Sequence, residues 1–223
     1  MKLYTSTNST PGRAVLLFCA EQRIPHETVI LDLRKGEHRE PPYLALNPNA
    51  LVPTLVDDDL ILTEGAAILR YLADKHASPA YPTELRARAR VNERLDWFNT
   101  QLQRDWTYHF LAPQLFPHQK RAPEEANRAT IEWGKTHAHR WMKVLDEHLL
   151  GARPYVAGDA ITIADYFGAA AIALGDVVRA DLSAYPNVTR WMTTMRALPS
   201  WQKVHHGLPG FAAALAGTPL LAF

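Results

Sequence analysis

The chain has 223 residues, of which 47% are hydrophobic and 21% charged, and its net charge is +1 at pH 7. This composition is that of a globular protein with one or two domains and a sizeable core. The small net charge gives no reason to expect nucleic acid or a membrane as a partner, and no apolar run approaches the roughly 20 residues that span a bilayer. A single cysteine, Cys19, excludes an intramolecular disulfide and a multi-cysteine metal site. Because the N-terminus lacks the apolar core of a signal peptide, we expect a cytoplasmic protein.

Residues 1–78 are expected to form a small mixed α/β unit. A strand, an amphipathic helix and a second strand come first. Two apolar runs on either side of three aspartates then indicate a hairpin, and a second helix follows it. The polar, proline-bearing segment between the two parts is expected to be loop or short helix. The expected strands are 1–5, 26–33, 51–56 and 60–63, and the expected helices are 11–23 and 64–76.

Residues 86–223, beyond a proline-bearing linker, show helical periodicity and no convincing strand, so we expect a second, all-α unit. A long helix is expected over 123–150, and a helix that is apolar nearly all round, and hence buried, over 158–178. The apolar tail 209–223 is expected to pack back on the body. The first helix of this unit is marked by four apolar residues at helical spacing, Val91, Leu95, Phe98 and Leu102.

The stretch Tyr4–Thr10 carries six hydroxyl side chains and one amide just before Pro11, a residue that suits a first helical turn. Such residues commonly cap a helix, and Ser9 by itself fits a cap better than a catalyst. The same helix start offers free N–H groups and a positive dipole end, which favour an anion or a thiolate. Both interpretations remain open on this stretch alone.

Pro53, in the sequence Leu-Val-Pro-Thr, belongs at the start or edge of a strand because proline cannot donate to a sheet. An ordinary trans bond is the interpretation that this dipeptide favours. The alternative is a cis bond that leaves the backbone of Val52 free to pair with an extended peptide.

Glu64 and Gly65 stand where the second expected helix begins. First-turn N–H groups lack partners within a helix, and glycine lets a ligand approach the backbone closely. A ligand carboxylate would suit these N–H groups, and the Glu64 side chain would suit an ammonium, as at the α-amino-acid end of a ligand. Simple capping is the competing and, for this motif alone, the favoured interpretation.

Thr162 and Asp165 have the spacing of a capping box, and here the structural interpretation is favoured. Losing such a cap costs on the order of 1 kcal/mol. Cys19 lies two turns into an apolar helix face and is expected to be a core residue. The histidines show no metal-binding spacing, since His137 and His139 point in different directions on a helix, and no metal is expected.

Together the motifs resemble the cytosolic glutathione transferase family, in a bacterial, theta-like or beta-like form with a serine-type first loop. They are S-x-P-x-R-A-V, K-G-E-H, V-P, T-E-G and G-D-x-x-T-x-A-D, in this order along nearly the whole chain. The resemblance implies a thioredoxin-like N-terminal domain, an α-helical bundle as C-terminal domain, a homodimer and a cis Pro53. It also implies an activity typical of detoxification, in which the thiolate of the cosubstrate glutathione attacks a small hydrophobic electrophile.

Carried over by this resemblance, Ser9 would donate a hydrogen bond to the glutathione sulfur, with Asn8 and Thr10 as rivals one residue away. Val52, beside Pro53, would pair with the cysteinyl backbone. The remaining contacts would come from Glu64 and Gly65 at the γ-glutamyl end and from His38 at the glycyl carboxylate, with Arg39 nearby.

The sequence departs from the family pattern at three positions. Gly65 stands where many members have serine, Leu51 where the beta branch has glutamine, and Thr10 where the beta branch has its cysteine. Mixed-disulfide chemistry on a protein cysteine is therefore not expected. The resemblance places the electrophile between the domains, with Trp106, Tyr108, His109 and Phe110 as candidate lining residues. For Tyr108 and His109, a place in the core is an equally favoured alternative. Two alternatives to conjugation are glutathione-dependent reduction of disulfides or peroxides, and a non-catalytic binding protein.

Overall fold

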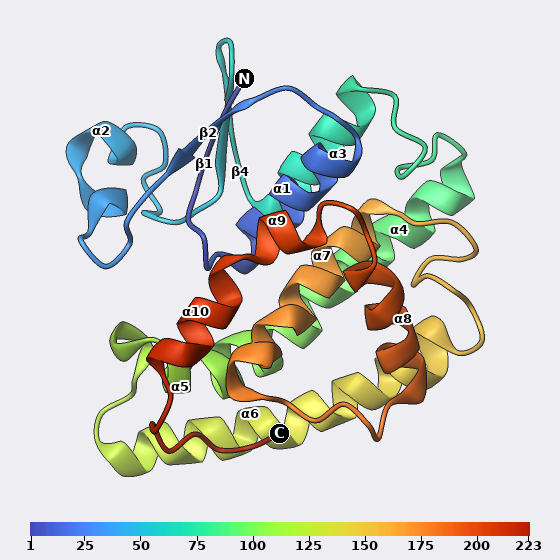
Figure 1. The fold of residues 1–223 in the computed structure, drawn as a ribbon. Coiled ribbons are helices and arrows are strands. Elements are labelled where there is room, and N and C mark those ends of the chain that lie inside the picture. Colours follow the sequence, from blue (N-terminus) through green and yellow to red (C-terminus); the bar gives the residue numbers. More distant parts are fainter.

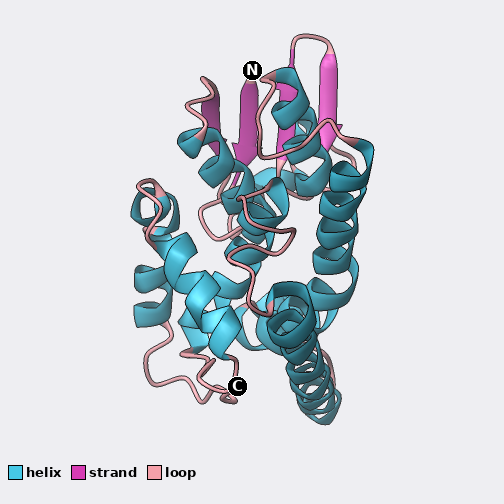
Figure 2. Ribbon diagram, turned by 90° about the vertical axis from the view of Figure 1, so that its right-hand side faces the viewer, coloured by secondary structure: helices cyan, strands magenta, loops and turns pink.

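The computed structural model describes all residues, 1–223, as a small sheet-containing half stacked on a larger helical half (Figures 1 and 2). The sheet has the strand order β2-β1-β3-β4. β1 and β2 are parallel, with Leu3 opposite Thr28, whereas β3 is antiparallel to both β1 and β4. The strands are β1 (Lys2–Thr5), β2 (Glu27–Ile30), β3 (Thr54–Asp57) and β4 (Leu60–Thr63).

Two helices of the first half, α1 and α3, lie on the side of the sheet that faces the helical half, and α2 lies on the other side (Figure 1). The apolar faces of α1 and α3 are buried, as their periodicity predicts. The bounds are α1 (Thr10–Glu21), the 3₁₀ turn η1 (Glu37–Arg39), α2 (Pro41–Leu44) and α3 (Gly65–Lys75).

The strand 51–56 predicted from the sequence is shorter than expected at its start. β3 begins at Thr54, because Pro53 has no N–H to give to the sheet and stands just before the strand. The Val52–Pro53 bond is cis, as the family resemblance implied. The segment 26–33 likewise forms a strand only over its central four residues.

The helical half contains no strand. Its first helix continues without a break from α4 into the π-helical segment η2, and the long expected helix 123–150 is α6 followed by a second π-helical turn, η4. The bounds are α4 (Leu85–Trp97), η2 (Phe98–Leu111), α5 (Ala112–Leu115), η3 (Pro117–Gln119), α6 (Glu124–Val144), η4 (Leu145–Leu150), α7 (Ile163–Ile172), η5 (Ala173–Val178), α8 (Pro186–Arg196), α9 (Trp201–His205) and α10 (Gly207–Ala214).

One continuous hydrophobic core runs through both halves, with α1 packed against α7. The apolar stripe Val91, Leu95, Phe98 and Leu102 is buried in it, and so is every residue of α7, as predicted. The apolar tail also packs on the body, as Phe211 and Phe223 contact the core. No helix combines the length and the apolar character needed to cross a bilayer.

The start of α7 is closed by the capping box that its sequence predicts. The Asp165 carboxylate accepts hydrogen bonds from the Thr162 N–H and hydroxyl (both 2.8 Å), the Val156 N–H (2.9 Å) and the Trp191 indole N–H (3.0 Å). Burial raises the pKa of this carboxyl to about 6, although the four donors act in the opposite direction. Asp165 is thus a fully buried structural residue that ties α7 to α8 and to the preceding loop.

Candidate functional site

The first element of the site is the start of α1. Ser9 is the N-cap residue, and its Oγ accepts a hydrogen bond of 3.1 Å from the Gly12 N–H. A hydroxyl that accepts still has its own proton to donate, and no hydrogen bond in the structure uses that proton. Ser9 is half-buried and stands at the positive end of the helix dipole. The arrangement therefore caps the helix and keeps a donor for a ligand.

The neighbours of Ser9 have different surroundings. Thr10 is 6% exposed, inside the first turn of α1. Asn8 points its Oδ1, which is buried and has no partner, close to the backbone of Gly207 at the start of α10. Thr5 is fully buried, and its Oγ1 lies where a Cβ on Gly12 would be, so the turn requires glycine there. Of the side chains around the cap, Ser9 has the geometry best suited to a sulfur ligand.

The second element is the Val52–Pro53 loop, which is held by one residue of α2 and one residue just after that helix. Tyr43 donates a hydrogen bond from its hydroxyl to the Leu51 carbonyl, and Asn47 donates one of 2.8 Å to the same oxygen. Both side chains also contact the Thr54 hydroxyl, at 2.9 and 3.1 Å. Val52 itself makes no backbone hydrogen bond within the protein. Its N–H and C=O are thus available to an extended peptide.

The third element is the start of α3. Glu64 is the N-cap residue, but its side chain makes no capping hydrogen bond, and its φ of 67° is uncommon for a residue other than glycine. Gly65 is buried so closely against the start of α1 that a Cβ on it would lie 2.7 Å from the Pro11 Cβ. A serine at this position, as many members of the family have, would require α1 and α3 to lie further apart. It also brings the positive ends of two helices together, which favours an anionic group between them.

These elements share a cavity of about 80 Å³ between the two halves, lined by residues of both. Four of the predicted site residues, Val52, Pro53, Glu64 and Gly65, lie in its wall, whereas Ser9 and His38 do not. The volume is small beside the roughly 300–1,000 Å³ of ligand pockets, so it suits one end of a peptide ligand. The full lining is Pro11, Asn47, Leu51, Val52, Pro53, Glu64, Gly65, Asn99, Gln103, Tyr108 and Phe167. A larger cavity of about 300 Å³, between β1 and α2, contains none of the predicted residues.

His38 lies in η1, away from this cavity. Its Nδ1 is buried without a partner. Burial lowers the pKa of the ring, and the charges of Arg39 and of His118 from the helical half lower it further. The imidazole is therefore a group that gains from an anion placed beside it.

The lining predicted for the helical half is only partly correct. Tyr108 does line the cavity; burial of its hydroxyl, and then the charge of Glu64, raise its pKa although the residue as a whole is 53% exposed. Trp106 and Phe110 are fully buried, and the Trp106 indole donates to the Ala171 carbonyl at 3.0 Å. These two predictions were wrong because the residues belong to the core.

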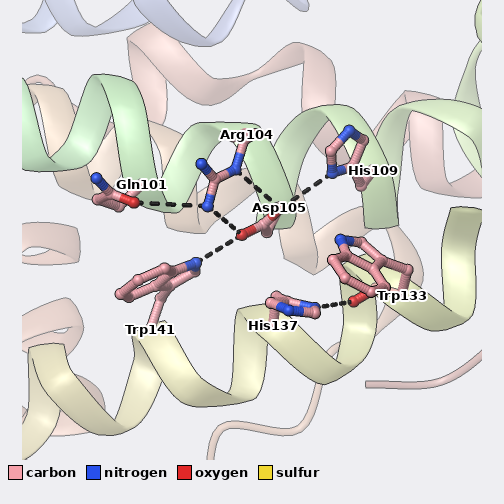
Figure 3. A network of polar contacts seen from close by, with 7 residues as sticks. All are labelled: Gln101, Arg104, Asp105, His109, Trp133, His137 and Trp141. Carbon is pink, nitrogen blue, oxygen red and sulfur yellow. Dashed lines mark hydrogen bonds and ion pairs between the residues drawn. The ribbon is translucent and has the colours of Figure 1, made fainter.

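His109 has the structural place that was the alternative for it, because its Cβ packs against Gly134 of α6 and its ring belongs to the network in Figure 3. Its Nδ1 pairs at 3.0 Å with Asp105, a buried carboxylate that also accepts from Trp141 (2.7 Å) and Arg104 (3.0 and 3.2 Å). Burial opposes ionisation of Asp105, yet its partners lower its pKa overall. This network joins η2 to α6 and has no contact with the cavity.

Asn99, Gln103 and Phe167 are cavity residues that the sequence did not point to. Asn99, Gln103 and Tyr108 are spaced by four and then five residues, the wide period of a π-helix with its i→i+5 bonds. A search for the period of 3.6 groups Gln103 with Trp106 and Phe110 instead. The usual helical period therefore does not identify these cavity residues, because the segment is a π-helix.

Thiol chemistry on the protein itself has little support. Cys19 is 2% exposed in the core, and burial raises the pKa of its thiol to about 12, so it is not a reactive thiolate. No three His, Cys, Asp or Glu side chains come together as a group that could hold a metal ion.

Comparison with known proteins identifies the family. The family models for "Glutathione S-transferase, N-terminal domain" and "Glutathione S-transferase, C-terminal domain" match residues 9–75 and 115–199. Human glutathione S-transferase theta-2B is 36% identical over 168 residues, 74% of this chain and 67% of the relative. Arabidopsis thaliana glutathione S-transferase T2 is 30% identical over 218 residues, 93% of this chain and 37% of that protein.

Comparison with solved structures leads to the same family. A crystal structure of human glutathione transferase theta-2, in complex with glutathione and an unknown ligand, has a TM-score of 0.87 at 30% identity and covers 100% of this chain and 93% of its own. The human theta-class enzyme in complex with the glutathione conjugate of 1-menaphthyl sulfate has a TM-score of 0.87 at 31% identity. The match covers 98% of this chain and 91% of the human chain. These matches confirm a thioredoxin-like N-terminal domain followed by an α-helical C-terminal domain. The chain belongs to the glutathione S-transferase family.

Proposed function

We propose that this protein is a glutathione transferase in which Ser9 stabilises the thiolate of bound glutathione. The observation that carries the proposal is the unused hydroxyl proton of Ser9 at the positive end of α1. A free thiol has a pKa of about 8.5, and lowering it by about two takes roughly 3 kcal/mol. A hydrogen bond to a charged group together with a helix end can supply that amount.

Glutathione is the cosubstrate, and its parts match the elements around the cavity. The N–H and C=O of Val52, which make no hydrogen bond within the protein, pair with the backbone of the cysteinyl residue. The cis Pro53, which has no N–H, ends the row of backbone groups that can pair with the peptide. The Gly65 N–H binds the γ-glutamyl carboxylate, and the Glu64 carboxylate attracts the ammonium. His38 binds the glycyl carboxylate with its unpartnered Nδ1.

The second substrate is a small hydrophobic electrophile that approaches the sulfur from the helical half. In a displacement, the thiolate forms a C–S bond and a halide leaves with the electron pair of its bond to carbon. In an addition, the π electrons of the electrophile move away from the attacked carbon and then take up a proton.

The finer classification is part of the proposal. A theta-like branch with a serine-type first loop is supported by the position of Ser9 at the cap and by the theta-class relatives. The relatives described above come from human and Arabidopsis, so a bacterial origin remains a prediction. A homodimer and a cytoplasmic location are proposed because they are typical of the family. Light scattering at the elution peak of a sizing column tests the dimer.

The decisive experiment compares wild type, Ser9→Ala and Thr10→Val in the conjugation of an activated aryl chloride. We expect Ser9→Ala to lose about 100-fold in kcat/KM, which corresponds to roughly 3 kcal/mol, while its affinity for glutathione changes little. Thr10→Val is the matched control and retains activity. Unchanged turnover in Ser9→Ala would overturn the role of Ser9.

Two alternative functions give other outcomes in the same assays. A glutathione-dependent reductase would turn over hydroxyethyl disulfide faster than the aryl chloride, and a Cys19→Ser variant would be unaffected because that thiol is buried. A non-catalytic binding protein would turn over neither substrate.

A further inference from the structure

The cavity between β1 and α2 is the larger of the two described above, and the proposed function does not use it. It has a volume of about 300 Å³ and lies on the side of the sheet that faces away from the helical half (Figure 1). No residue lines both cavities. The volume is at the lower end of the range for pockets that bind small molecules. The full lining is Tyr4, Leu31, Glu37, Glu40, Pro42, Tyr43 and Leu46.

Aromatic and aliphatic side chains form most of this wall. The rings of Tyr4 and Tyr43 have centroids 5.9 Å apart and planes at 52°, so they meet as a corner and not as a stacked pair. Leu31, Pro42 and Leu46 add aliphatic surface. The face of a tyrosine ring carries partial negative charge and attracts a cation. This part of the wall therefore suits an apolar group that is attached to a positive charge.

The two other lining residues are both acidic. Glu37 accepts a hydrogen bond of 2.7 Å from the Asp32 N–H, whereas the Glu40 side chain does not cap α2 and forms no ion pair. No lysine, arginine or histidine lines the cavity, and Lys35 from the same segment pairs with Asp32 instead. Two carboxylates on one wall without a cation repel each other. A cationic ligand would remove this repulsion.

We propose that this cavity is a binding site for a small organic cation, in which an ammonium group is attached to an aromatic or aliphatic body. The ammonium group binds beside Glu37 and Glu40, and the apolar body contacts the tyrosine corner and the aliphatic wall. The same two carboxylates disfavour an anion, including either carboxylate end of glutathione. The site goes beyond the proposed function and does not depend on it.

The test compares three probes of similar size, 3-phenylpropylammonium, 3-phenylpropanol and 3-phenylpropionate. Binding at neutral pH is measured by ligand-observed NMR, which detects millimolar affinities. Saturating S-hexylglutathione is present, so that the proposed glutathione and electrophile sites are filled. We expect wild type to bind the ammonium at least about fivefold more tightly than the alcohol, and to bind the carboxylate most weakly.

Glu40→Gln removes a charge and breaks no capping bond or ion pair. It should weaken the ammonium by about fivefold to tenfold and leave the affinity for the alcohol within about twofold. Glu125→Gln is the matched control, because it removes an exposed charge at the start of α6, outside the cavity, and it should change neither affinity. Leu46→Ala should weaken both probes equally, by about threefold. Tyr43 is left unchanged, because its hydroxyl holds the Leu51 carbonyl.

Several outcomes would overturn the inference. They are equal binding of the three probes, tightest binding of the carboxylate, and no ammonium binding up to about 10 mM. An unchanged ammonium affinity in Glu40→Gln, or the same loss in Glu125→Gln, would also overturn it, because the charge of Glu40 would then have no specific effect. The proposed function is tested separately by the turnover of Ser9→Ala, so either idea can fail while the other holds.

Discussion

Helices α7 and α3 both begin at motifs visible in the sequence, yet the two starts are completed in opposite ways. At α7, Asp165 accepts four hydrogen bonds and is fully buried. At α3, the Glu64 side chain makes no capping bond, and Glu64 and Gly65 line a cavity. A helix start whose polar groups are all paired stabilises the fold, whereas one left unpaired beside a cavity can bind a ligand. The start of α1 lies between these extremes, with one capping bond and one unused proton.

Replacing Asp165 by alanine tests the start of α7, where the polar groups are paired, and should have the largest effect on stability. The change leaves the buried N–H groups of Val156, Thr162 and Trp191 without their acceptor. We expect the free energy of unfolding to fall by about 3–5 kcal/mol, measured by urea denaturation. The exposed Asp159→Ala is the control and should change it by less than about 0.5 kcal/mol. A loss under about 1 kcal/mol would mean that the cap matters little.

Replacing Gly65 by alanine tests the start of α3, where the cap is unpaired beside a cavity. The added Cβ would lie 2.7 Å from the Pro11 Cβ, so α1 and α3 must separate. We expect a loss of about 1–3 kcal/mol in stability, together with weaker binding of glutathione. Gly210→Ala is a suitable control, because an added Cβ there meets nothing within 4 Å. Wild-type stability and affinity in Gly65→Ala would contradict the tight contact.

Ser9→Ala should lower turnover strongly while lowering the stability of the fold only slightly. It removes a single capping bond, so we expect about 1 kcal/mol of lost stability, seen as a fall of roughly 2–4 °C in the melting temperature. This loss is far below that of Asp165→Ala, although the effect on turnover is large. A loss as great as that of Asp165→Ala would place Ser9 among the structural caps.

The smallest expected effect concerns pH. Burial, followed by Arg39 and His118, lowers the pKa of His38, so its ring is neutral at neutral pH. Only the protonated ring attracts the glycyl carboxylate by charge, so glutathione should bind several-fold more tightly as the pH falls from neutral through the lowered pKa of His38, which lies below the usual value of about 6.5. His38→Gln should flatten this dependence, and the exposed His148→Gln should not. An identical slope in wild type and His38→Gln would exclude this role.

The sequence was sufficient for features that depend on local pattern. The apolar stripe from Val91 to Leu102, the buried helix α7 and the hairpin of β3 and β4 all follow from the spacing of apolar residues. The capping box at Asp165 could also be predicted from the sequence, because such a box is contained within four residues.

Other features depend on contacts that a local pattern does not contain. The dipeptide Val52–Pro53 favours a trans bond by itself, whereas in the fold its loop is held by Tyr43 of α2 and by Asn47, which follows that helix. The wide turns of η2 bring Gln103 and Tyr108 to the cavity, and the usual helical period misplaces them. The buried setting of Trp106 likewise depends on α7, more than 60 residues further along the chain.

The way the loop of Leu51, Val52 and Pro53 is held has a consequence for engineering. The hydrogen bonds that fix the Leu51 carbonyl and Thr54 come from Tyr43 and Asn47, within the same domain. A chimaera that keeps residues 1–78 and exchanges the helices should therefore retain its cosubstrate while its choice of electrophile changes.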